Sequence, residues 1–287
     1  MPAPKNDPTI AIIGVGLIGG SFGLALRRAG FKGAILGVSS PAALEAGLRM
    51  GAISRKATLQ EAAACADLIY LAQPVDRILL TLKELGPLIR SGCLVTDAGS
   101  TKMQIVQTAA QSLPPRTFLG GHPMAGKERR GVEAADPELF RGRPYVLTPD
   151  PTAPPNLLEE FRNWLHRFGA RIIEMSPAEH DATVAFTSHL PQLLSVALAN
   201  SLGLQNNAYL ERVFGPGLLD MTRLALSDFE LWESIVASNK QQILLALEAF
   251  KSRLSTIESA LQGDSDMRLL FSSAAEFAKK IREMESG

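Results

Sequence analysis

This 287-residue sequence lacks several features that would mark a specialised class of protein. Its two cysteines, Cys65 and Cys93, lie in unrelated contexts, which excludes a disulfide framework and a cysteine metal site and fits a reducing cytoplasm. Its 29 basic and 29 acidic side chains cancel, so no charge excess indicates nucleic acid or an anionic membrane as a partner. The longest stretch without Asp, Glu, Lys or Arg, residues 182–210, contains His189 and Pro191 and is interpreted as a buried helix pair, not a membrane span.

What remains is an ordinary globular composition, with 46% hydrophobic and 20% charged residues, in a chain long enough for two domains. Short apolar runs alternate with helical patterns through the first half. The predicted strands are Ile10–Ile13, Ala34–Val38, Leu68–Ala72, Leu94–Thr96, Phe118–Leu119, Tyr145–Thr148 and Arg171–Glu174. The helical patterns between them include Ser21–Arg28, Pro41–Arg49 and Asn156–Phe168. This alternation predicts an α/β fold of the Rossmann type, with a doubly wound, mostly parallel sheet covered by helices on both faces.

The second half changes character near Ser176 and contains no convincing strand. Apolar residues between Asp228 and Leu261 recur at helical spacing and predict one long helix, and those between Met267 and Ile281 predict a last helix. We therefore expect a dinucleotide-binding domain over residues 1–176 and an all-helical domain over residues 177–287. Long amphipathic helices often bury their apolar face against a partner subunit, so we expect a homodimer formed through the helical domain.

A glycine-rich turn follows the first predicted strand and opens the first helix. In Gly14-Val15-Gly16-Leu17-Ile18-Gly19, the first glycine permits a tight turn, the second lets the backbone approach a pyrophosphate, and the third lets helix and strand pack closely. The phosphates would then lie on the helix N-terminus at Leu17 and Ile18, where backbone N–H groups and the helix dipole favour anions. The motif predicts a bound dinucleotide; the alternative is a glycine-rich turn without a ligand.

The end of the second predicted strand bears on the choice between NAD and NADP. An NAD site is expected to carry an acidic residue there for the ribose 2′-hydroxyl, but this strand ends at Ser39 and Ser40. A serine pair does not repel a 2′-phosphate and can donate hydrogen bonds to it, which favours NADP and leaves NAD open. No arginine follows immediately; Arg27 or Arg28 could reach the phosphate, or both could lie on a solvated helix face.

Three further motifs stand at the carboxyl ends of predicted strands: Gln73-Pro74-Val75, Asp97-Ala98-Gly99-Ser100-Thr101-Lys102 and Gly121-His122-Pro123. In an open parallel sheet the ligand lies in the crevice outside these ends, so the three motifs converge on the dinucleotide. Histidine is the side chain best suited to accept a proton near neutral pH. A rigidly held His122 beside a hydride acceptor predicts the oxidation of an alcohol.

The chain at this point resembles the prephenate and arogenate dehydrogenases of tyrosine biosynthesis, through motifs in the family order along nearly the whole sequence. They are Gly14-Val15-Gly16-Leu17-Ile18-Gly19-Gly20-Ser21, Thr96-Asp97-Ala98-Gly99-Ser100-Thr101-Lys102, Gly121-His122-Pro123-Met124-Ala125-Gly126, Pro144-Tyr145-Val146-Leu147-Thr148-Pro149, Glu179-His180-Asp181, Ser188-His189-Leu190-Pro191 and Asp220-Met221-Thr222-Arg223. The resemblance implies oxidative decarboxylation: hydride leaves C4 of a cyclohexadienol, carbon dioxide leaves C1, and the ring becomes aromatic.

The resemblance also implies roles for individual residues. His122 would take the proton of the C4 hydroxyl, and Ser100 would orient that hydroxyl or the imidazole, although Ser100 could also cap the following helix. Arg223 would hold a substrate carboxylate or, alternatively, form an interdomain salt bridge. His189 would contact the side-chain end of the substrate or, alternatively, be a satisfied core histidine.

Other residues of the motifs have less definite roles. His180 and Asp181 are interpreted as a structural pair at the domain junction. Glu128 matches a family position that gates the active site, but it lies in a charge cluster that could simply be solvated. Trp232 is a candidate contact for tyrosine acting as a competitive inhibitor, or a core residue. We expect a monofunctional enzyme.

Two alternatives stay open. A dehydrogenase of the β-hydroxyacid or imine-reductase type would rely on a lysine of the helical domain, for which Lys240 is the candidate. A nucleotide-sensing protein would bind NADP without turnover and would not need His122, Ser100 and Arg223 together. The sequence does not separate prephenate from arogenate, which differ only in a keto or amino group; the hint of NADP tilts slightly toward arogenate.

Overall fold

The structure is a computed structural model that describes residues 8–150, 155–263 and 266–286. The chain forms two compact units, Met1–Val184 with Ser227–Ser238, and Ala185–Leu226 with Asn239–Gly287. The sequence indicated one boundary after residue 176, whereas the structure keeps residues 177–184 and 227–238 with the first unit. The first unit thus holds the sheet together with two short helical pieces from the second half of the chain.

An eight-stranded sheet forms the centre of the first unit, in the order β3-β2-β1-β4-β5-β6-β7-β8. Neighbouring strands are parallel except β6 and β7, which pair antiparallel. The strands are β1 (Ile10–Ile13), β2 (Ile35–Val38), β3 (Arg55–Lys56), β4 (Leu68–Leu71), β5 (Leu94–Asp97), β6 (Phe118–Pro123), β7 (Pro144–Thr148) and β8 (Arg171–Glu174). The predicted α/β fold with a mostly parallel sheet is confirmed, while β3, an exposed pair of residues, has no counterpart among the predicted strands.

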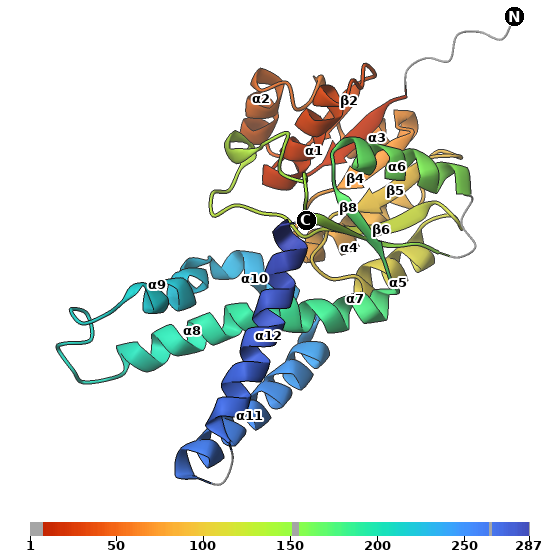
Figure 1. Cartoon of the computed structure of the whole chain (residues 1–287). Coiled ribbons are helices and arrows are strands. Elements are labelled where there is room, and N and C mark those ends of the chain that lie inside the picture. The colour runs from red at the N-terminus through yellow and green to blue at the C-terminus, as the bar shows by residue number, and fades with distance from the viewer. Residues whose placement is uncertain (1–7, 151–154, 264–265, 287) are drawn as a thin grey trace, which may run out of the picture. The chain divides into compact units, whose positions relative to one another are not determined.

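Helices cover both faces of this sheet (Figure 1). One face packs against α1 (Leu17–Arg28), α2 (Pro41–Arg49) and α6 (Pro155–Arg167). The other packs against α3 (Leu59–Cys65), α4 (Val75–Leu85) and α5 (Met103–Ser112). Alternate residues of β1 enter the two cores, Ile10 and Ile12 on the first face and Ala11 and Ile13 on the second. This explains why the strand sequences are continuously apolar: both faces of the parallel part are buried.

The remaining helical elements differ from the prediction in two places. The expected single helix from Asp228 to Leu261 is wrong, because it breaks at Asn239 into α10 (Phe229–Ser238) and α11 (Lys240–Gln262). The expected helix pair over residues 182–210 is also wrong, because one continuous helix runs from Pro177 to Gly203. By length and composition alone that helix could cross a membrane, but a core helix of a soluble protein often has the same length and composition. A third of its most apolar window is buried.

That long helix is built of α7 (Pro177–Val184), the π-helical turn η2 (Ala185–His189) and α8 (Leu190–Gly203). The second unit continues with α9 (Pro216–Thr222), the short 3₁₀ turn η3 (Arg223–Leu226), α11 and α12 (Met267–Ser286). A short 3₁₀ turn, η1 (Val132–Ala134), lies between β6 and β7 of the first unit.

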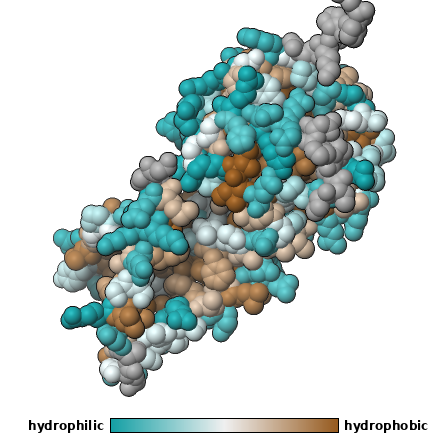
Figure 2. Space-filling model, turned by 45° about the vertical axis from the view of Figure 1, so that its right-hand side comes forward, coloured by the Kyte–Doolittle hydropathy of each residue, from teal (hydrophilic) through white to brown (hydrophobic). Residues whose placement is uncertain are grey.

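The second unit has a small core and a large exposed apolar surface. Its buried cluster consists of Ala185, Leu190 and Ala246, with Leu194, Leu247 and Phe250 packed against it. Exposed apolar side chains lie along α11 and α12, and Figure 2 shows hydrophobic side chains at the surface among hydrophilic ones. On α12 they are Leu269, Phe271, Phe277, Ile281 and Met284. Apolar surface of this extent typically marks an interaction site.

Candidate active site

The glycine turn between β1 and α1 has the geometry that a dinucleotide requires. Gly14 adopts a φ of +98°, and a Cβ there would lie 2.5 Å from the carbonyl oxygen of Ala72. A Cβ on Gly19 would lie 2.1 Å from the carbonyl oxygen of Gly14, so this glycine permits the close packing of helix on turn. A Cβ on Gly16 would meet nothing within 4 Å. Gly16 also begins α1 without a side-chain cap, so the N-terminal N–H groups of the helix, at Leu17 and Ile18, are left for an anion.

The end of β2 presents the two serines, but not with equal freedom. Ser40 is the N-cap of α2 and accepts a hydrogen bond from the Ala43 N–H at 3.4 Å, whereas Ser39 is half-buried immediately after the strand. The guanidinium of Arg27 donates to the carbonyl oxygens of Phe31 and Gly33, both at 2.9 Å. Arg28 forms an ion pair with Glu138 at 2.8 Å. Both arginines are therefore engaged within the protein, and the assignment of Ser39 to the 2′ position stays a prediction.

The end of β4 lies against the glycine turn. The sheet reverses its order between β1 and β4, and the crevice of a doubly wound sheet opens at such a switch point. A Cβ on Gly14 would lie 3.0 Å from Cγ of Gln73, so the Gln73-Pro74 motif borders the turn. The Gln73 side-chain oxygen accepts a hydrogen bond from the Thr81 hydroxyl at 2.8 Å, which fixes it, and Pro74 is the first residue before α4.

His122 lies inside β6, where its backbone is held by both neighbouring strands. The sequence placed the Gly-His-Pro motif after a strand ending at Leu119, but β6 continues to Pro123. His122 pairs with Val146 of β7. A Cβ on Gly120 would lie 2.2 Å from Oγ1 of Thr148, and one on Gly121 would lie 2.6 Å from the carbonyl oxygen of Asp97. The two glycines thus allow β6 to fit closely between β5 and β7, and this fixes the position of the buried imidazole.

His122 is joined to a second buried histidine. Nδ1 of His122 lies 2.8 Å from Nε2 of His180, and Nδ1 of His180 lies 2.7 Å from Oδ1 of Asp181. The Asp181 carboxylate also accepts hydrogen bonds from two backbone N–H groups, of Lys102 at 2.6 Å and of Met103 at 2.9 Å. Residues of α7, β6 and the start of α5 therefore form one hydrogen-bonded chain, although 58 residues separate the two histidines.

A buried ion pair closes this chain into a ring. The Lys102 ammonium pairs with the Asp97 carboxylate, and neither side chain is exposed. Asp97 accepts hydrogen bonds from the Gly99 N–H at 2.8 Å and the Gly121 N–H at 3.0 Å, which ties it to the residue before His122. The ring thus runs from His122 through His180, Asp181, Lys102 and Asp97 back to β6. The sequence offered little sign of it beyond the family motifs that contain these residues.

Burial lowers the pKa of the two basic side chains that this network holds, His180 and Lys102. Desolvation lowers the pKa of His180, and the hydrogen bond to Asp181 opposes this only in part. Desolvation also lowers the pKa of Lys102, opposed by the charge of Asp97. The imidazole of His180 is therefore held neutral near pH 7, between an acceptor carboxylate and His122.

Ser100 lies at the same edge of the sheet as His122. It follows β5, which is the parallel neighbour of β6, and it is half-buried. The interpretation of Ser100 as a helix cap is wrong, because α5 begins at Met103 with Lys102 as its N-cap residue. The N–H groups of the first turn are satisfied by Asp181 instead. The hydroxyl of Ser100 is thus not used at the start of α5.

His189 and Arg223 belong to the second unit, where each is described in its own surroundings. His189 is the last residue of the π-helical turn; it is buried, and its Nδ1 accepts a hydrogen bond from the Asn239 amide at 3.2 Å. π-Turns inside helices frequently mark functional positions. Arg223 is exposed at the end of α9, and Lys240 is exposed at the start of α11. The roles of His189 and Arg223 toward a substrate stay predictions.

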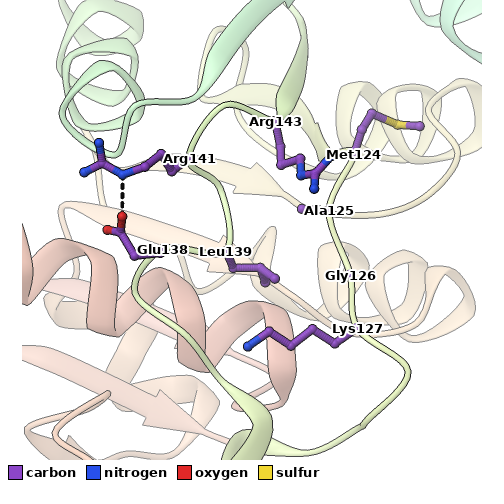
Figure 3. A pocket seen from close by; sticks show the side chains of 8 residues that line it. All are labelled: Met124, Ala125, Gly126, Lys127, Glu138, Leu139, Arg141 and Arg143. Carbon is purple, nitrogen blue, oxygen red and sulfur yellow. Dashed lines mark hydrogen bonds and ion pairs between the residues drawn. The ribbon is translucent and has the colours of Figure 1, made fainter. Parts of the chain in front are cut away.

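A cavity of about 490 Å³ lies beside this site, between the loop after β6 and the loop before β7 (Figure 3). Its lining residues are Met124, Ala125, Gly126, Lys127, Glu138, Leu139, Arg141 and Arg143. Two of its cations are paired: Arg141 with Glu138, and Lys127 with Asp136 at 2.8 Å. The cavity includes neither His122 nor the glycine turn, so we place the site over the ends of β1, β4, β5 and β6.

The loop after β6 also carries Glu128, which is exposed. Its neighbour Arg130 forms an ion pair with Asp228 at 2.9 Å, which links this loop to the segment before α10. Trp232 is half-buried on α10, a helix that packs against α4. A gating role for Glu128 and an inhibitor contact for Trp232 stay predictions.

Comparison with protein families matches residues 22–174 to the nucleotide-binding domain of prephenate dehydrogenase and residues 176–275 to its dimerization domain. The prephenate dehydrogenase of Bacillus subtilis (strain 168) is 37% identical over 246 residues, which cover 82% of this chain and 65% of that protein. That of Lactococcus lactis is 36% identical over 257 residues, which cover 86% of this chain and 70% of that protein. The chain thus spans less than two thirds of the length of the Bacillus protein.

Solved structures agree with this match. A prephenate dehydrogenase from A. aeolicus, in complex with hydroxyphenyl propionate and NAD+, superimposes with a TM-score of 0.87 at 29% identity, over 98% of this chain and 99% of that chain. The arogenate dehydrogenase of Synechocystis gives a TM-score of 0.81 at 30% identity, over 95% of this chain and 99% of that chain.

Proposed function

Because the chain belongs to the prephenate dehydrogenase family, we propose that it oxidatively decarboxylates prephenate or arogenate, with NAD(P) as the hydride acceptor. The products are 4-hydroxyphenylpyruvate from prephenate and tyrosine from arogenate, each with carbon dioxide. The observation that carries this proposal is the buried imidazole of His122, held in β6 by the ring of hydrogen bonds. It lies at the same sheet edge as the glycine turn, which supplies the combination of base and dinucleotide that an alcohol dehydrogenase requires.

The glycine turn fits a dinucleotide in its own geometry. Gly14, Gly16 and Gly19 form the cradle, and the N–H groups of Leu17 and Ile18 would bind the pyrophosphate. Gln73 and Pro74 border the same turn and would line the crevice. When bound there, the nicotinamide supplies the acceptor for the hydride that leaves C4 of the substrate.

His122 and Ser100 are the residues that act on the proton of the C4 hydroxyl. His122 accepts the proton of the C4 hydroxyl as the C4–H bond breaks, so that a carbonyl forms at C4. When the C1–carboxylate bond breaks, its electron pair makes the ring aromatic and leaves a phenolate, to which His122 returns the proton. Ser100, at the same edge of the sheet, orients the hydroxyl toward the imidazole. Holding these groups in place before the reaction lowers the entropic part of the barrier.

Arg223 and His189 are the residues proposed to bind the rest of the substrate. The Arg223 guanidinium matches the geometry of a carboxylate and is exposed, as a substrate-binding group must be. The His189 imidazole would contact the side chain of prephenate or arogenate; the Asn239 amide bonded to its Nδ1 supports a fixed ring orientation. Lys240 is the lysine that a β-hydroxyacid-type dehydrogenase would use. It lies exposed at the start of α11, whereas His122 is buried and held by hydrogen-bonded side chains.

NADP is the preferred cofactor in this proposal, with NAD as the alternative. Support comes from Ser39, the half-buried polar group at the end of β2, and from the lack of a carboxylate in that position.

A homodimer, formed through the helical domain, is supported by the exposed apolar side chains of α11 and α12 and by the match to a dimerization domain. We place the protein in the cytoplasm, since both cysteines are free thiols.

The proposed function is tested by assaying the purified protein with prephenate or arogenate and with NAD⁺ or NADP⁺ while following nicotinamide reduction. Turnover in at least one of the combinations is expected. A His122→Asn variant should lose about 10²–10⁴-fold in kcat because it cannot accept the proton. His166→Asn, on the exposed surface of α6, is the matched control and should keep wild-type kcat. Binding of NADP⁺ without turnover of either substrate would overturn the proposal and favour a nucleotide sensor.

A further inference from the structure

We infer that His180 and Asp181 are positioning residues that hold the proton of His122 on Nδ1 and so present its Nε2 as the base. The tautomer of His122 is argued from the structure alone; only its role as the base in catalysis rests on the proposed function. Its structural content is a chain of two hydrogen bonds, His122 to His180 and His180 to Asp181, between groups that are nine-tenths or more buried. The direction of each bond follows from the group at the end of the chain.

Asp181 sets the direction because its carboxylate is held as an acceptor. Oδ1 accepts the N–H of Lys102, the N-cap residue of α5, and Oδ2 accepts the N–H of Met103, the first residue of this ten-residue helix. Both oxygens of Asp181 thus already receive N–H donors, as in a carboxylate that acts only as an acceptor. An ionised carboxylate has no proton to give, so His180 must carry its proton on Nδ1 and donate it to Oδ1 at 2.7 Å.

His180 transmits this direction to His122. It is fully buried, and desolvation lowers its pKa, so it stays neutral and has one proton, the one on Nδ1. Its Nε2 therefore carries a lone pair and can only accept. Nδ1 of His122, 2.8 Å away, must be the donor of that hydrogen bond. A neutral His122 then has no proton on Nε2, which is the nitrogen that can receive one from a substrate hydroxyl.

The charged groups around the pair support the same arrangement. Those that act on His180 are Asp181 on its own helix, Lys102 at the start of α5 and Asp97 at the end of β5. Lys102 and Asp97 neutralise each other as an ion pair, so Asp181 remains the negative charge that the two imidazoles face. When His122 takes a proton, its imidazolium donates to His180, whose dipole is oriented by Asp181. In serine proteases a buried aspartate similarly selects the tautomer of the catalytic histidine.

The first test observes the tautomers directly and needs no turnover. The chain has four histidines, so two-bond ¹H–¹⁵N correlation spectra of the ¹⁵N-histidine-labelled full-length protein can be assigned with single His→Gln variants. At about pH 7.5, above the ordinary histidine pKa, we expect His122 and His180 both to be neutral with the proton on Nδ1. A wild-type His122 protonated on Nε2 would overturn the inference, whatever the enzyme assays show.

The second test compares two variants of the intermediate residue. His180→Gln retains a donor for Asp181 and an acceptor for His122, whereas His180→Leu has neither. We expect His180→Leu to lower kcat about 10²–10³-fold and to shift the acid limb of its pH profile, with His180→Gln recovering much of the loss. The affinity for NADP⁺, measured by fluorescence titration, should not change in either variant, and His166→Gln should match the wild type. Equal kcat and pH profiles for the Leu and Gln variants would contradict the inference.

Discussion

The ammonium of Lys102 and the carboxylate of Asp97 form an ion pair to which solvent has no access, since neither side chain has any exposed surface. The Asp97 carboxylate also accepts hydrogen bonds from the backbone N–H groups of Gly99 and Gly121. Lys102 in turn contributes its own backbone N–H to Asp181. The pair therefore joins β5, the start of α5 and the strand that carries His122.

Removal of one charge of this pair should destabilise the fold strongly. Lys102→Met leaves Asp97 buried without its counter-ion, and we expect the free energy of unfolding to fall by about 3–5 kcal/mol. Lys56→Met breaks the exposed ion pair with Glu45 and should cost about 0–1 kcal/mol. Urea unfolding of both variants measures the difference. An equal, small loss in the two variants would show that the buried pair does not stabilise the fold.

His180 should make stability depend on pH in the neutral to acid range. Desolvation lowers its folded-state pKa below the unfolded value of about 6.5, so between the two values the unfolded chain binds more protons. This contribution to stability is therefore present above about pH 6.5 and is lost as the pH falls toward the folded pKa. We expect the free energy of unfolding to drop between about pH 7.5 and about pH 5.5, and to drop less steeply in His180→Gln.

The control for this pH dependence is His166→Gln, whose imidazole is exposed and which should follow the wild-type slope. If His180→Gln lost stability as steeply as the wild type, the depressed pKa of His180 would not be the cause of the pH dependence.

Two glycines of the cofactor turn should separate stability from binding. A Cβ at Gly19 would lie 2.1 Å from a backbone oxygen, so Gly19→Ala should lower the free energy of unfolding by at least about 1–3 kcal/mol. A Cβ at Gly16 meets nothing within 4 Å, so Gly16→Ala should fold normally but weaken dinucleotide binding about tenfold. Thermal unfolding and fluorescence titration with NADP⁺ measure the two effects. Normal affinity in Gly16→Ala would contradict the placement of the pyrophosphate at this glycine.

The cofactor preference should respond to a single charge at the end of β2. Ser39→Asp places a carboxylate where the 2′-phosphate of NADP would lie, and repulsion should lower the NADP/NAD ratio of kcat/KM about tenfold or more. Ser39→Asn, which adds similar volume without charge, is the matched control. A ratio that is unchanged in Ser39→Asp would show that the 2′ position has been assigned to the wrong residue.

The exposed apolar face of α12 should mediate dimerisation. Phe277 is 66% exposed in the single chain, and a Phe277→Glu variant should shift the protein toward monomer, because a charge would enter an apolar interface. Leu80→Glu, an equivalent change at an exposed apolar residue of α4, should leave the assembly unchanged. Sedimentation equilibrium at micromolar concentration distinguishes these outcomes, and a monomeric wild-type protein would overturn the proposed homodimer.

The sequence predicted the elements whose signals are local. The strands of the parallel sheet are continuous apolar runs bounded by turns, and α2 spans Pro41–Arg49 as predicted. Helical periodicity, by contrast, passes through Asn239 without interruption, so it could not reveal that one helix there becomes two in different units. Gly120 and Gly121 are required by the close approach of β7 and of β5 to β6, which only the pairing of distant strands defines.

The candidate site likewise contains residues that the sequence identifies locally and residues that only the fold brings together. His122 and the glycine turn were identified from residue type and spacing alone. The pairing of His122 with His180 was not, because the two residues meet only after the fold brings α7 beside β6. Likewise, the start of α5 lacks a capping side chain of its own, and its cap comes from a residue 78 positions later in the chain.

The capping of α5 by Asp181 has a consequence for the dynamics of the molecule. The amide protons of Lys102 and Met103 can exchange with solvent only when their hydrogen bonds to Asp181 open. The same opening would release His180, and with it the orientation of the imidazole in β6. The exchange protection of two backbone amides therefore records how much of the time the base is assembled, in the resting protein and without any substrate present.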